Sequence, residues 1–468
     1  MLFSSLIFLY YFLPIILIAL FIAPSKWQNA LLLLASLIFY AWGNVSYLFI
    51  LMGSVVFNYS CGLWIDRTTN SWPIRFGIAT NLILLILFKY TNFFLENWND
   101  ILLTFEYMPI QWPVIPLPIG ISFFTFQAIS YLVDVKLGRT SVQKNPLDLG
   151  LYIALFPQLI AGPIVRYQDI AHQIKHRQRS WQQFSEGIER FIWGLAKKVL
   201  LANQFALLAD EIFSIQPVNL DTVTAWVGIL CYTLQIYFDF SGYSDMAIGL
   251  GKMFGFHIPE NFNFPYAASS IKDFWRRWHI SLSTWFRDYL YIPLGGNRIS
   301  PQRTYFNLII VFFLTGLWHG ANWTFIFWGL FHGSFLIFER LGGVKVLDRI
   351  GRPFAILYSL LVVIIGWVFF RSPNLSYALG YCQSMIGWNG TPSFQFDLMY
   401  YLDYEFLFFA GISLMACTPL LKQAWQWLTN QKSMILQLIS VIILITTFLY
   451  CTMHLVVNNY NPFIYFQF

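Results

Sequence analysis

Long apolar runs, interrupted by Pro, Gly and charged residues, follow one another along the whole chain. An α-helix needs about 20 apolar residues to cross the hydrocarbon core of a bilayer. The pattern predicts helices at 3–22, 28–43, 46–65, 76–95, 117–135, 223–250, 305–320, 322–339, 354–370, 405–421 and 434–454, with a shorter candidate at 199–215. The chain is therefore predicted to be an all-α polytopic membrane protein with about 11–12 transmembrane helices.

Two segments do not fit a simple bundle of spanning helices. Residues 151–168 are apolar, but Pro157, Gly162 and Pro163 would break a helix there, so a re-entrant or interfacial element is predicted. Residues 257–303 are rich in aromatic and basic side chains, which makes them too polar to span a membrane and too apolar for a free loop. This second segment is predicted to lie on, or dip into, the cytoplasmic face of the membrane.

The composition agrees with a membrane protein. Of the 468 residues, 57% are hydrophobic and 11% are charged, whereas soluble domains are about a quarter charged. No polar stretch is long enough for a separate soluble domain, so residues 1–468 are predicted to form a single membrane domain. The five cysteines include no C-x-x-C pair, which argues against a metal site or a disulfide framework.

The distribution of Lys and Arg predicts the orientation of the chain in the membrane. The stretches 96–116 and 372–404 contain neither residue, whereas 136–198, 252–303 and 340–352 are rich in both. By the positive-inside rule, the three basic segments are cytoplasmic and the other two are external. The net charge of +6 is therefore interpreted as an orientation signal and not as a nucleic-acid-binding surface.

His319 is the first candidate for chemistry, because it lies in an apolar run in the sequence GLWHG. A helix over 305–318 would be about 21 Å long, which places His319 past the middle of a hydrocarbon core about 30 Å thick. An ionisable side chain at that depth is costly and marks a functional site, and a neutral imidazole can take a proton from a hydroxyl and return it. The alternative is a helix-packing histidine, because Gly316 and Gly320 form a small-xxx-small pair.

A second histidine, His332, lies in the sequence GLFHG, which is similar to the GLWHG around His319. On one continuous helix, thirteen residues rotate the chain by about 220°, so His332 would face away from His319. Only a break in the Gly-rich stretch between them would let both face one cavity. His332 is interpreted as a structural histidine near the membrane interface.

The third histidine, His279, lies in the amphipathic segment 257–303. If this segment is helical, Trp275 and His279 share one face. Arg276 and Arg277 lie beside them and have the chemistry to bind phosphates, such as those of coenzyme A or a phosphopantetheine carrier. The alternative is that the two arginines fix the topology and meet lipid headgroups.

Other polar residues are assigned structural roles. Asp239 and Asp245 lie inside an apolar run, and pairing with a buried Arg or hydroxyl is favoured over a proton relay. The sequence GLGK at 249–252 lacks the first Gly and the Ser or Thr of a P-loop. His172 and His176 have helical spacing but no accompanying H-E-x-x-H glutamate, so a solvated basic face is expected.

Five ordered segments together resemble the membrane-bound O-acyltransferase superfamily. They are most similar to the bacterial branch that contains the alginate O-acetyltransferase membrane component and the membrane protein for D-alanylation of teichoic acid. The resemblance covers nearly the whole chain. The segments are PLPIGISFFTFQ (116–127), FPQLIAGPIVR (156–166), FDFSGYSDMAIGLG (238–251), FWRRWHISLSTWFRDYLYIPLGGNR (274–298) and GLWHGANWTFIFWGLFHG (316–333).

The resemblance implies roles for the candidate residues. His319 matches the catalytic histidine, which in this family is set in a central tunnel through the protein, and His279 matches a second functional polar group. His319 would remove the proton of the acceptor hydroxyl, and His279 would orient the thioester or stabilise the oxyanion. Trp275, Arg276 and Arg277 are the candidates for donor binding, and no metal is implied.

The resemblance also implies substrates, partners and a location. A cytoplasmic thioester, acetyl-CoA or an acyl-carrier thioester, would donate an acetyl group that passes across the membrane to a periplasmic acetyltransferase partner. No tightly bound cofactor is expected. The chain would be a multi-pass protein of the bacterial inner membrane, and the acceptor would be alginate or a similar exopolysaccharide.

Three alternatives remain open at this point. The first keeps the enzyme class and changes the reaction to D-alanyl or peptidoglycan O-acyl transfer. The second is a transporter for a polysaccharide or lipid-linked sugar, since buried charges and broken segments are also transporter features. The third is a scaffold for a polysaccharide synthesis complex, in which both His279 and His319 would be dispensable.

Overall fold

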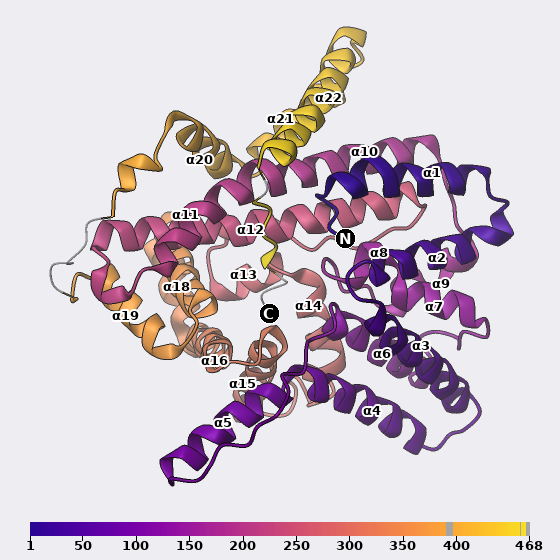
Figure 1. The fold of residues 1–468 in the computed structure, drawn as a ribbon, viewed down its shortest axis with the longest axis horizontal. Coiled ribbons are helices and arrows are strands. Elements are labelled where there is room, and N and C mark those ends of the chain that lie inside the picture. The colour runs from indigo at the N-terminus through magenta and orange to yellow at the C-terminus, as the bar shows by residue number, and fades with distance from the viewer. Residues whose placement is uncertain (390–395, 459, 465–468) are drawn as a thin grey trace. The chain divides into compact units, whose positions relative to one another are not determined.

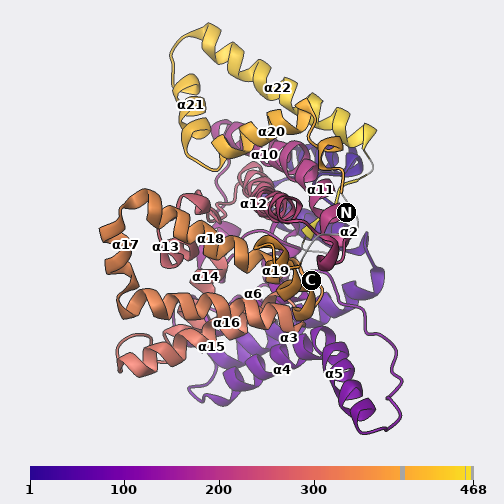
Figure 2. The same cartoon turned by 90° about the vertical axis from the view of Figure 1, so that its left-hand side faces the viewer.

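The computed structural model describes residues 1–389, 396–458 and 460–464, and Figures 1 and 2 show its fold. These residues form helices and contain no strand, which confirms the predicted all-α class. The chain divides into two compact units. The first comprises residues 1–187 and 250–259, and the second comprises residues 188–249 and the described residues of 260–464. Residues 390–395 of the predicted external stretch 372–404 lie outside the described part of the chain.

The first unit is built from short and medium helices. α2 packs against α7, and α3 and α4 both pack against α6. Its helices are η1 (Phe8–Phe12), α1 (Leu13–Ile22), η2 (Ser25–Trp27), α2 (Gln28–Ala41), α3 (Val45–Asp66), α4 (Trp72–Lys89), α5 (Thr91–Thr104), α6 (Ile121–Lys136), α7 (Pro146–Ala154), α8 (Phe156–Leu159) and α9 (Tyr167–Lys175).

Two helices, α10 (Trp181–Ala196) and α12 (Thr222–Met253), contribute residues to both units. The remaining helices belong to the second unit, in which α16 packs against α15, α13 and α18. They are η3 (Lys197–Ala202), α11 (Asn203–Ser214), η4 (Pro217–Asn219), η5 (Pro265–Ala267), α13 (Ile271–Arg277), α14 (Ile280–Phe286), η6 (Arg287–Tyr291), α15 (Pro301–His319), α16 (Trp323–Phe338), η7 (Glu339–Gly343), α17 (Val344–Ile350), α18 (Arg352–Arg371), α19 (Leu375–Met385), η8 (Leu398–Tyr400), α20 (Tyr404–Ala416), α21 (Leu420–Thr429) and α22 (Met434–Val457).

Polar side chains mark the starts of several helices. The Asn145 side chain accepts a hydrogen bond from the Leu147 amide at the start of α7, and Ser300 does the same for Arg303 at the start of α15. Asn322 caps α16 through the Thr324 amide. These caps satisfy N–H groups that have no partner within the helix, and they therefore set where each helix begins.

The number of helices long enough to span a membrane is smaller than the number of apolar runs. Within the described residues, six helices are long and apolar enough, or seven if the pair α20 and α21, which bends by 80°, forms one span. The difference from the predicted 11–12 arises because apolar runs such as 28–43 and 117–135 form helices of only 14 and 16 residues. The six spans nevertheless make the chain a multi-pass membrane protein.

The two segments expected to depart from spanning helices do so. Residues 151–165 lie in the core of the first unit, where α7 ends at Ala154, α8 adds one turn and the chain then extends past Gly162. The segment 257–303 forms the short helices η5, α13, α14 and η6. The placement of either segment relative to a membrane, and the central tunnel, remain predictions.

Candidate active site

The hairpin of α15 and α16 positions two of the candidate histidines, and Figure 2 shows the two helices side by side. His319 is the last residue of α15, and α16 begins four residues later at Trp323. Glycines allow the two backbones to approach closely. A Cβ at Gly316 would lie 2.3 Å from the Phe325 carbonyl oxygen, and a Cβ at Gly329 would lie 2.2 Å from that of Phe312.

The break between α15 and α16 brings His319 and His332 to the same aromatic ring. The centroid of Trp328 lies 5.0 Å from that of His319 and 5.2 Å from that of His332. The opposite orientation expected for one continuous helix does not occur, because the chain leaves the helix at Gly320. Both imidazoles are buried, with exposed fractions of 5% and 0%.

His279 lies at a break between α13 and α14, so the continuous helix that would place it on one face with Trp275 does not form. Its φ of 43° and ψ of 54° are left-handed, a conformation that costs a residue other than glycine about 1–3 kcal/mol. The loop residue Asn261 stabilises this turn, because its backbone carbonyl accepts a hydrogen bond from the Ile280 amide at 3.0 Å.

The side chain of Asn261 also determines the tautomer of His279. Its amide nitrogen donates to Ser244 Oγ at 3.1 Å, and its Oδ1 accepts from the Ser281 amide at 3.2 Å. Oδ1 therefore faces His279 Nδ1, which lies 3.2 Å away. A neutral imidazole donates from one nitrogen only, so Nδ1 bears the proton and Nε2 presents a lone pair.

Burial determines the charge state of His279. The side chain is fully buried, and the ring of Phe240 packs edge-on against it with centroids 4.7 Å apart. Desolvation lowers the pKa of His279 to about 3, so the imidazole is neutral at physiological pH. In that state Nε2 accepts hydrogen bonds. The two roles considered for His279, orienting the thioester and stabilising the oxyanion, remain predictions.

Tryptophans connect the three histidines into one cluster. Trp318 lies between His279 and His319, with ring centroids 5.9 Å and 5.0 Å away. Trp275 packs against His332 and Trp328, at 5.3 Å and 5.6 Å. The predicted residues His279, His319 and Trp275 are thus brought together, and His332 joins them. Apolar aromatic surroundings of this kind exclude water and strengthen polar interactions with a bound substrate.

The two arginines beside His279 are at least partly exposed. Arg277 forms an ion pair with Asp273 of α13 at 3.0 Å, and its guanidinium is partly exposed. Arg276 is exposed. Neither arginine contacts a histidine of the cluster through any interaction between described residues. They remain available at a surface, where donor binding stays a prediction.

Two residues that build the site, Asn261 and Glu339, were not singled out from the sequence. Asn261 lies in a loop, and a lone Asn has no recognisable signature. Glu339 accepts hydrogen bonds from the amides of Ile271 and Lys272, at 2.5 Å and 3.0 Å, and so attaches the start of α13 to the end of α16. A carboxylate at the end of an apolar run, as Glu339 is, was the available signal.

The remaining polar candidates have the structural roles predicted for them. Asp239 pairs with Lys198 at 2.7 Å, and Asp245 pairs with Arg190 and Lys197, both at 2.7 Å. The GLGK sequence lies inside α12 and forms no phosphate-binding loop. His172 and His176 are exposed. No group of three or more His, Cys, Asp or Glu suited to a metal ion occurs among the residues described.

Comparison with known proteins places these features in a wider context. The model for MBOAT, the membrane-bound O-acyltransferase family, matches residues 120–345, which include the three histidines. The chain is 48% identical over 391 residues to a probable alginate O-acetylase, AlgI, of Pseudomonas aeruginosa, covering 82% of this chain and 75% of that protein. It is 41% identical over 431 residues to a peptidoglycan O-acetyltransferase of Helicobacter pylori, covering 83% and 80%. A teichoic acid D-alanyltransferase of Bacillus subtilis is 30% identical over 230 residues, covering 46% and 56%.

Proposed function

Because the chain belongs to the membrane-bound O-acyltransferase family and is therefore an O-acyltransferase, we propose that it transfers an acetyl group to an exported polysaccharide. The donor would be a cytoplasmic thioester, acetyl-CoA in the first instance. The observation that supports this most is the buried aromatic cluster, in which the ring of Trp318 lies within 6 Å of the rings of both His279 and His319. The 48% identity to a probable alginate O-acetylase supports the same proposal.

The proposed chemistry assigns different tasks to the two histidines. His319 takes the proton of the acceptor hydroxyl as its oxygen attacks the thioester carbonyl, a contribution of typically about 10²–10⁴-fold. The carbon–sulfur bond then breaks, and the thiolate leaves with the proton that His319 returns. His279 accepts a hydrogen bond at Nε2 and thereby orients the bound substrate, while Arg276 and Arg277 offer charge for the donor phosphates.

The acceptor is proposed to be alginate or a similar exopolysaccharide. Acetyl transfer is favoured over D-alanyl transfer, because the O-acetyltransferase relatives match over four fifths of this chain and the D-alanyltransferase of Bacillus subtilis matches over 46%. Peptidoglycan is the second candidate, supported by the Helicobacter pylori relative. The protein would act in the bacterial inner membrane and deliver the acetyl group to a periplasmic acetyltransferase partner.

Reconstitution tests the reaction. Purified protein in liposomes would be supplied with radiolabelled acetyl-CoA, an oligosaccharide acceptor and a periplasmic extract that provides the partner, and both thiol release and labelled product would be measured. We expect transfer by the wild type, none by His319→Ala, and full transfer by His172→Ala, in which an exposed imidazole outside the cluster is removed. Transfer by a correctly inserted His319→Ala protein would overturn the catalytic assignment.

The acceptor needs a cellular measurement. O-acetyl groups on exopolysaccharide and on peptidoglycan would be quantified by NMR in a deletion strain and after complementation. Loss confined to the exopolysaccharide supports the proposal, and loss confined to peptidoglycan contradicts it. Unchanged acetylation of both polymers, together with defective export, would favour the transporter alternative.

A further inference from the structure

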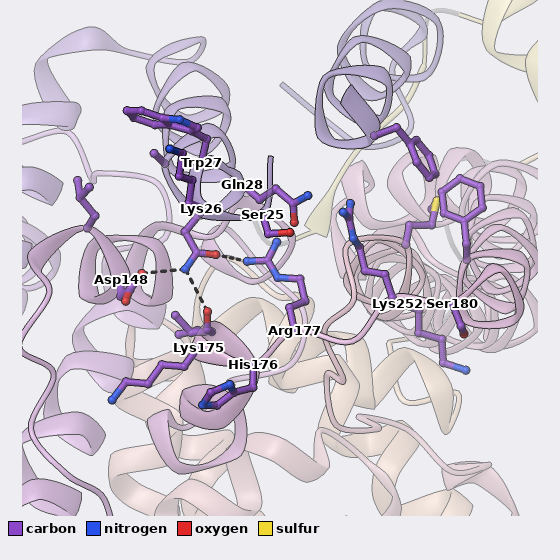
Figure 3. A pocket seen from close by; sticks show the side chains of 18 of the residues that line it. Ser25, Lys26, Trp27, Gln28, Asp148, Lys175, His176, Arg177, Ser180 and Lys252 are labelled. Atoms are coloured by element: carbon purple, nitrogen blue, oxygen red, sulfur yellow. Dashed lines mark hydrogen bonds between the residues drawn. The ribbon is translucent and has the colours of Figure 1, made fainter. Parts of the chain in front are cut away.

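A cavity of about 860 Å³ in the first unit is lined by basic side chains and has no part in the acyl transfer described above. Figure 3 shows it between the start of α2, the start of α7 and the segment that joins α9 to α10. Among the described residues, Asp148 is the one carboxylate that lines it. The cationic side chains that line it are Lys26, Lys175, Arg177, Arg179 and Lys252.

The guanidinium of Arg177 is preorganised within this cavity. Its Nη2 donates to Asn29 Oδ1, and its plane lies over the ring of Phe256, 4.3 Å from the centroid. Nε and Nη1 are buried and have no hydrogen-bond partner among the described residues. Nε–H and Nη1 point to different sides of the guanidinium, so they do not form a bidentate pair for one anion. What Arg177 supplies at the cavity wall is a positive charge whose position is fixed by Asn29 and Phe256.

The support for Arg177 is itself fixed. Asn29 Nδ2 donates to Asp148 Oδ1 at 2.8 Å and to the Ile174 carbonyl at 3.0 Å. Gly255 packs against the side chain of Arg177. Its φ is 82°, and a Cβ at this position would lie 2.8 Å from Arg177 Cγ, so a larger residue would displace the arginine. The carboxylate of Asp148 is therefore engaged with Asn29, and no acidic side chain forms an ion pair with Arg177 in the described part of the chain.

The charge around Arg177 is not neutralised locally. Lys26 and Lys175 are exposed and form no ion pair within the described residues, while Lys252 pairs with Glu186 at 2.9 Å. Burial lowers the pKa of Arg177 to about 10, which leaves it protonated at neutral pH. A cavity of this size with excess positive charge attracts an anion that is larger than a single small ion.

The surroundings of the cavity are those of a membrane interface. The exposed rings of Phe21 and Trp181 stack with centroids 5.5 Å apart, and Trp27 is 60% exposed. Aromatic side chains of this kind concentrate at the level of lipid headgroups. α1, which ends beside the cavity, exposes a row of apolar side chains that includes Ile15 and Ile18. The positive-inside rule places the basic segment 136–198 on the cytoplasmic side.

We propose that this basic cavity binds the phosphate headgroup of an anionic phospholipid of the cytoplasmic leaflet. Arg177 would hold a fixed positive charge against the phosphate, Lys26 and Lys175 would supply long-range attraction, and the acyl chains would lie along the exposed face of α1. Basic pockets on the cytoplasmic side of membrane proteins have the chemistry for such headgroups. The same phosphate chemistry would accept free phosphate or coenzyme A, so the test separates these sources.

Binding of short-chain phosphatidylglycerol to the full-length protein, purified in a zwitterionic detergent, provides the test. We expect saturable binding that short-chain phosphatidylcholine does not match. Arg177→Lys retains the charge and loses the contacts with Asn29 and Phe256 that fix its position, and Lys175→Gln removes an exposed charge with little risk to folding. Each variant should weaken binding, Arg177→Lys by about tenfold or more. Lys144→Gln, an exposed lysine of the same basic segment that does not line the cavity, should leave it unchanged.

Competition identifies the source of the phosphate. Neither inorganic phosphate nor coenzyme A at millimolar concentration should displace the lipid. Displacement by coenzyme A would overturn the lipid assignment in favour of a nucleotide site, and displacement by inorganic phosphate would overturn it in favour of a free-anion site. Equal lipid binding by the wild type, Arg177→Lys and Lys175→Gln would overturn the site altogether. Acetyl transfer is not the readout, so the proposed function stands or fails separately.

Discussion

Asn261 Oδ1 lies 3.2 Å from His279 Nδ1, and this contact determines which nitrogen of the imidazole faces the aromatic cluster as an acceptor. The same oxygen accepts from Ser281 Oγ at 2.8 Å. One loop side chain thus supports a left-handed turn and sets a tautomer. Asn261 is a positioning residue by this geometry, since its own contacts are with protein groups.

Replacement of Asn261 should separate positioning from simple folding. Asn261→Leu removes the acceptor that His279 Nδ1 and Ser281 Oγ share. We expect a loss of about 1–3 kcal/mol, which corresponds to about a 5–150-fold lower transfer rate if the loss falls on the transition state. Asn261→Asp retains the acceptor and adds a charge that raises the pKa of His279. We therefore expect Asn261→Asp to recover part of the activity and to move the acidic limb of the pH–rate profile to higher pH. Identical pH profiles for the wild type and Asn261→Asp would contradict this role.

Acid should destabilise the protein through His279. The pKa of this side chain is about 3 when folded and about 6.5 when unfolded, so between these values the unfolded chain binds more protons. The contribution of His279 to the free energy of unfolding is fully present above about pH 6.5 and is lost as the pH falls towards 3. The loss is at most about 1.4 kcal/mol per pH unit. Thermal unfolding in detergent between pH 7 and pH 4 should show a shallower decline for His279→Gln. Parallel declines would contradict the assignment.

His332 and His319 should respond differently to removal of the imidazole. Both ring nitrogens of His332 are buried with no hydrogen-bond partner within the described residues. His332→Leu removes these unsatisfied groups, so we expect a higher midpoint of thermal unfolding and less than about tenfold loss of acetyl transfer. His319→Leu should abolish transfer. A loss of about 10²-fold or more in a stable His332→Leu protein would instead assign His332 to proton transfer.

The close approach of α15 and α16 should tolerate no side chain at Gly329. A Cβ there would meet the Phe312 carbonyl at 2.2 Å and force the helices apart, at a cost of about 1–3 kcal/mol. We expect Gly329→Ala to lower both thermal stability and transfer, because Trp328 and His319 separate. The matched control is Gly411→Ala in α20, where nothing lies within 4 Å of the added Cβ, and a gain of about 0.4–1 kcal/mol is expected. Equal stability of the two variants would argue against the close approach.

The sequence alone determines the membrane class of the chain, its broken apolar segment and its need for buried ion pairs. Apolar runs long enough to span a bilayer, together with the small number of charged residues, determine the membrane class, because lipid accommodates such an apolar surface and water does not. Pro157 and Gly162 predict the broken segment, because each acts on the backbone conformation near its own position. Buried carboxylates such as Asp239 require a cationic partner wherever the chain folds, so their pairing was predictable although the partner Lys198 was not.

Tertiary structure decided the rest. Helical periodicity predicts a continuous helix through His279, but a hydrogen-bond acceptor from the distant loop residue Asn261 stabilises a left-handed turn there instead. The break at Gly320 turns His332 towards Trp328, where local rotation alone would turn it away. The basic cavity gathers Lys26, Arg177 and Lys252 from separate parts of the sequence. Contacts between residues far apart in sequence leave no local pattern, and only the folded chain brings them together.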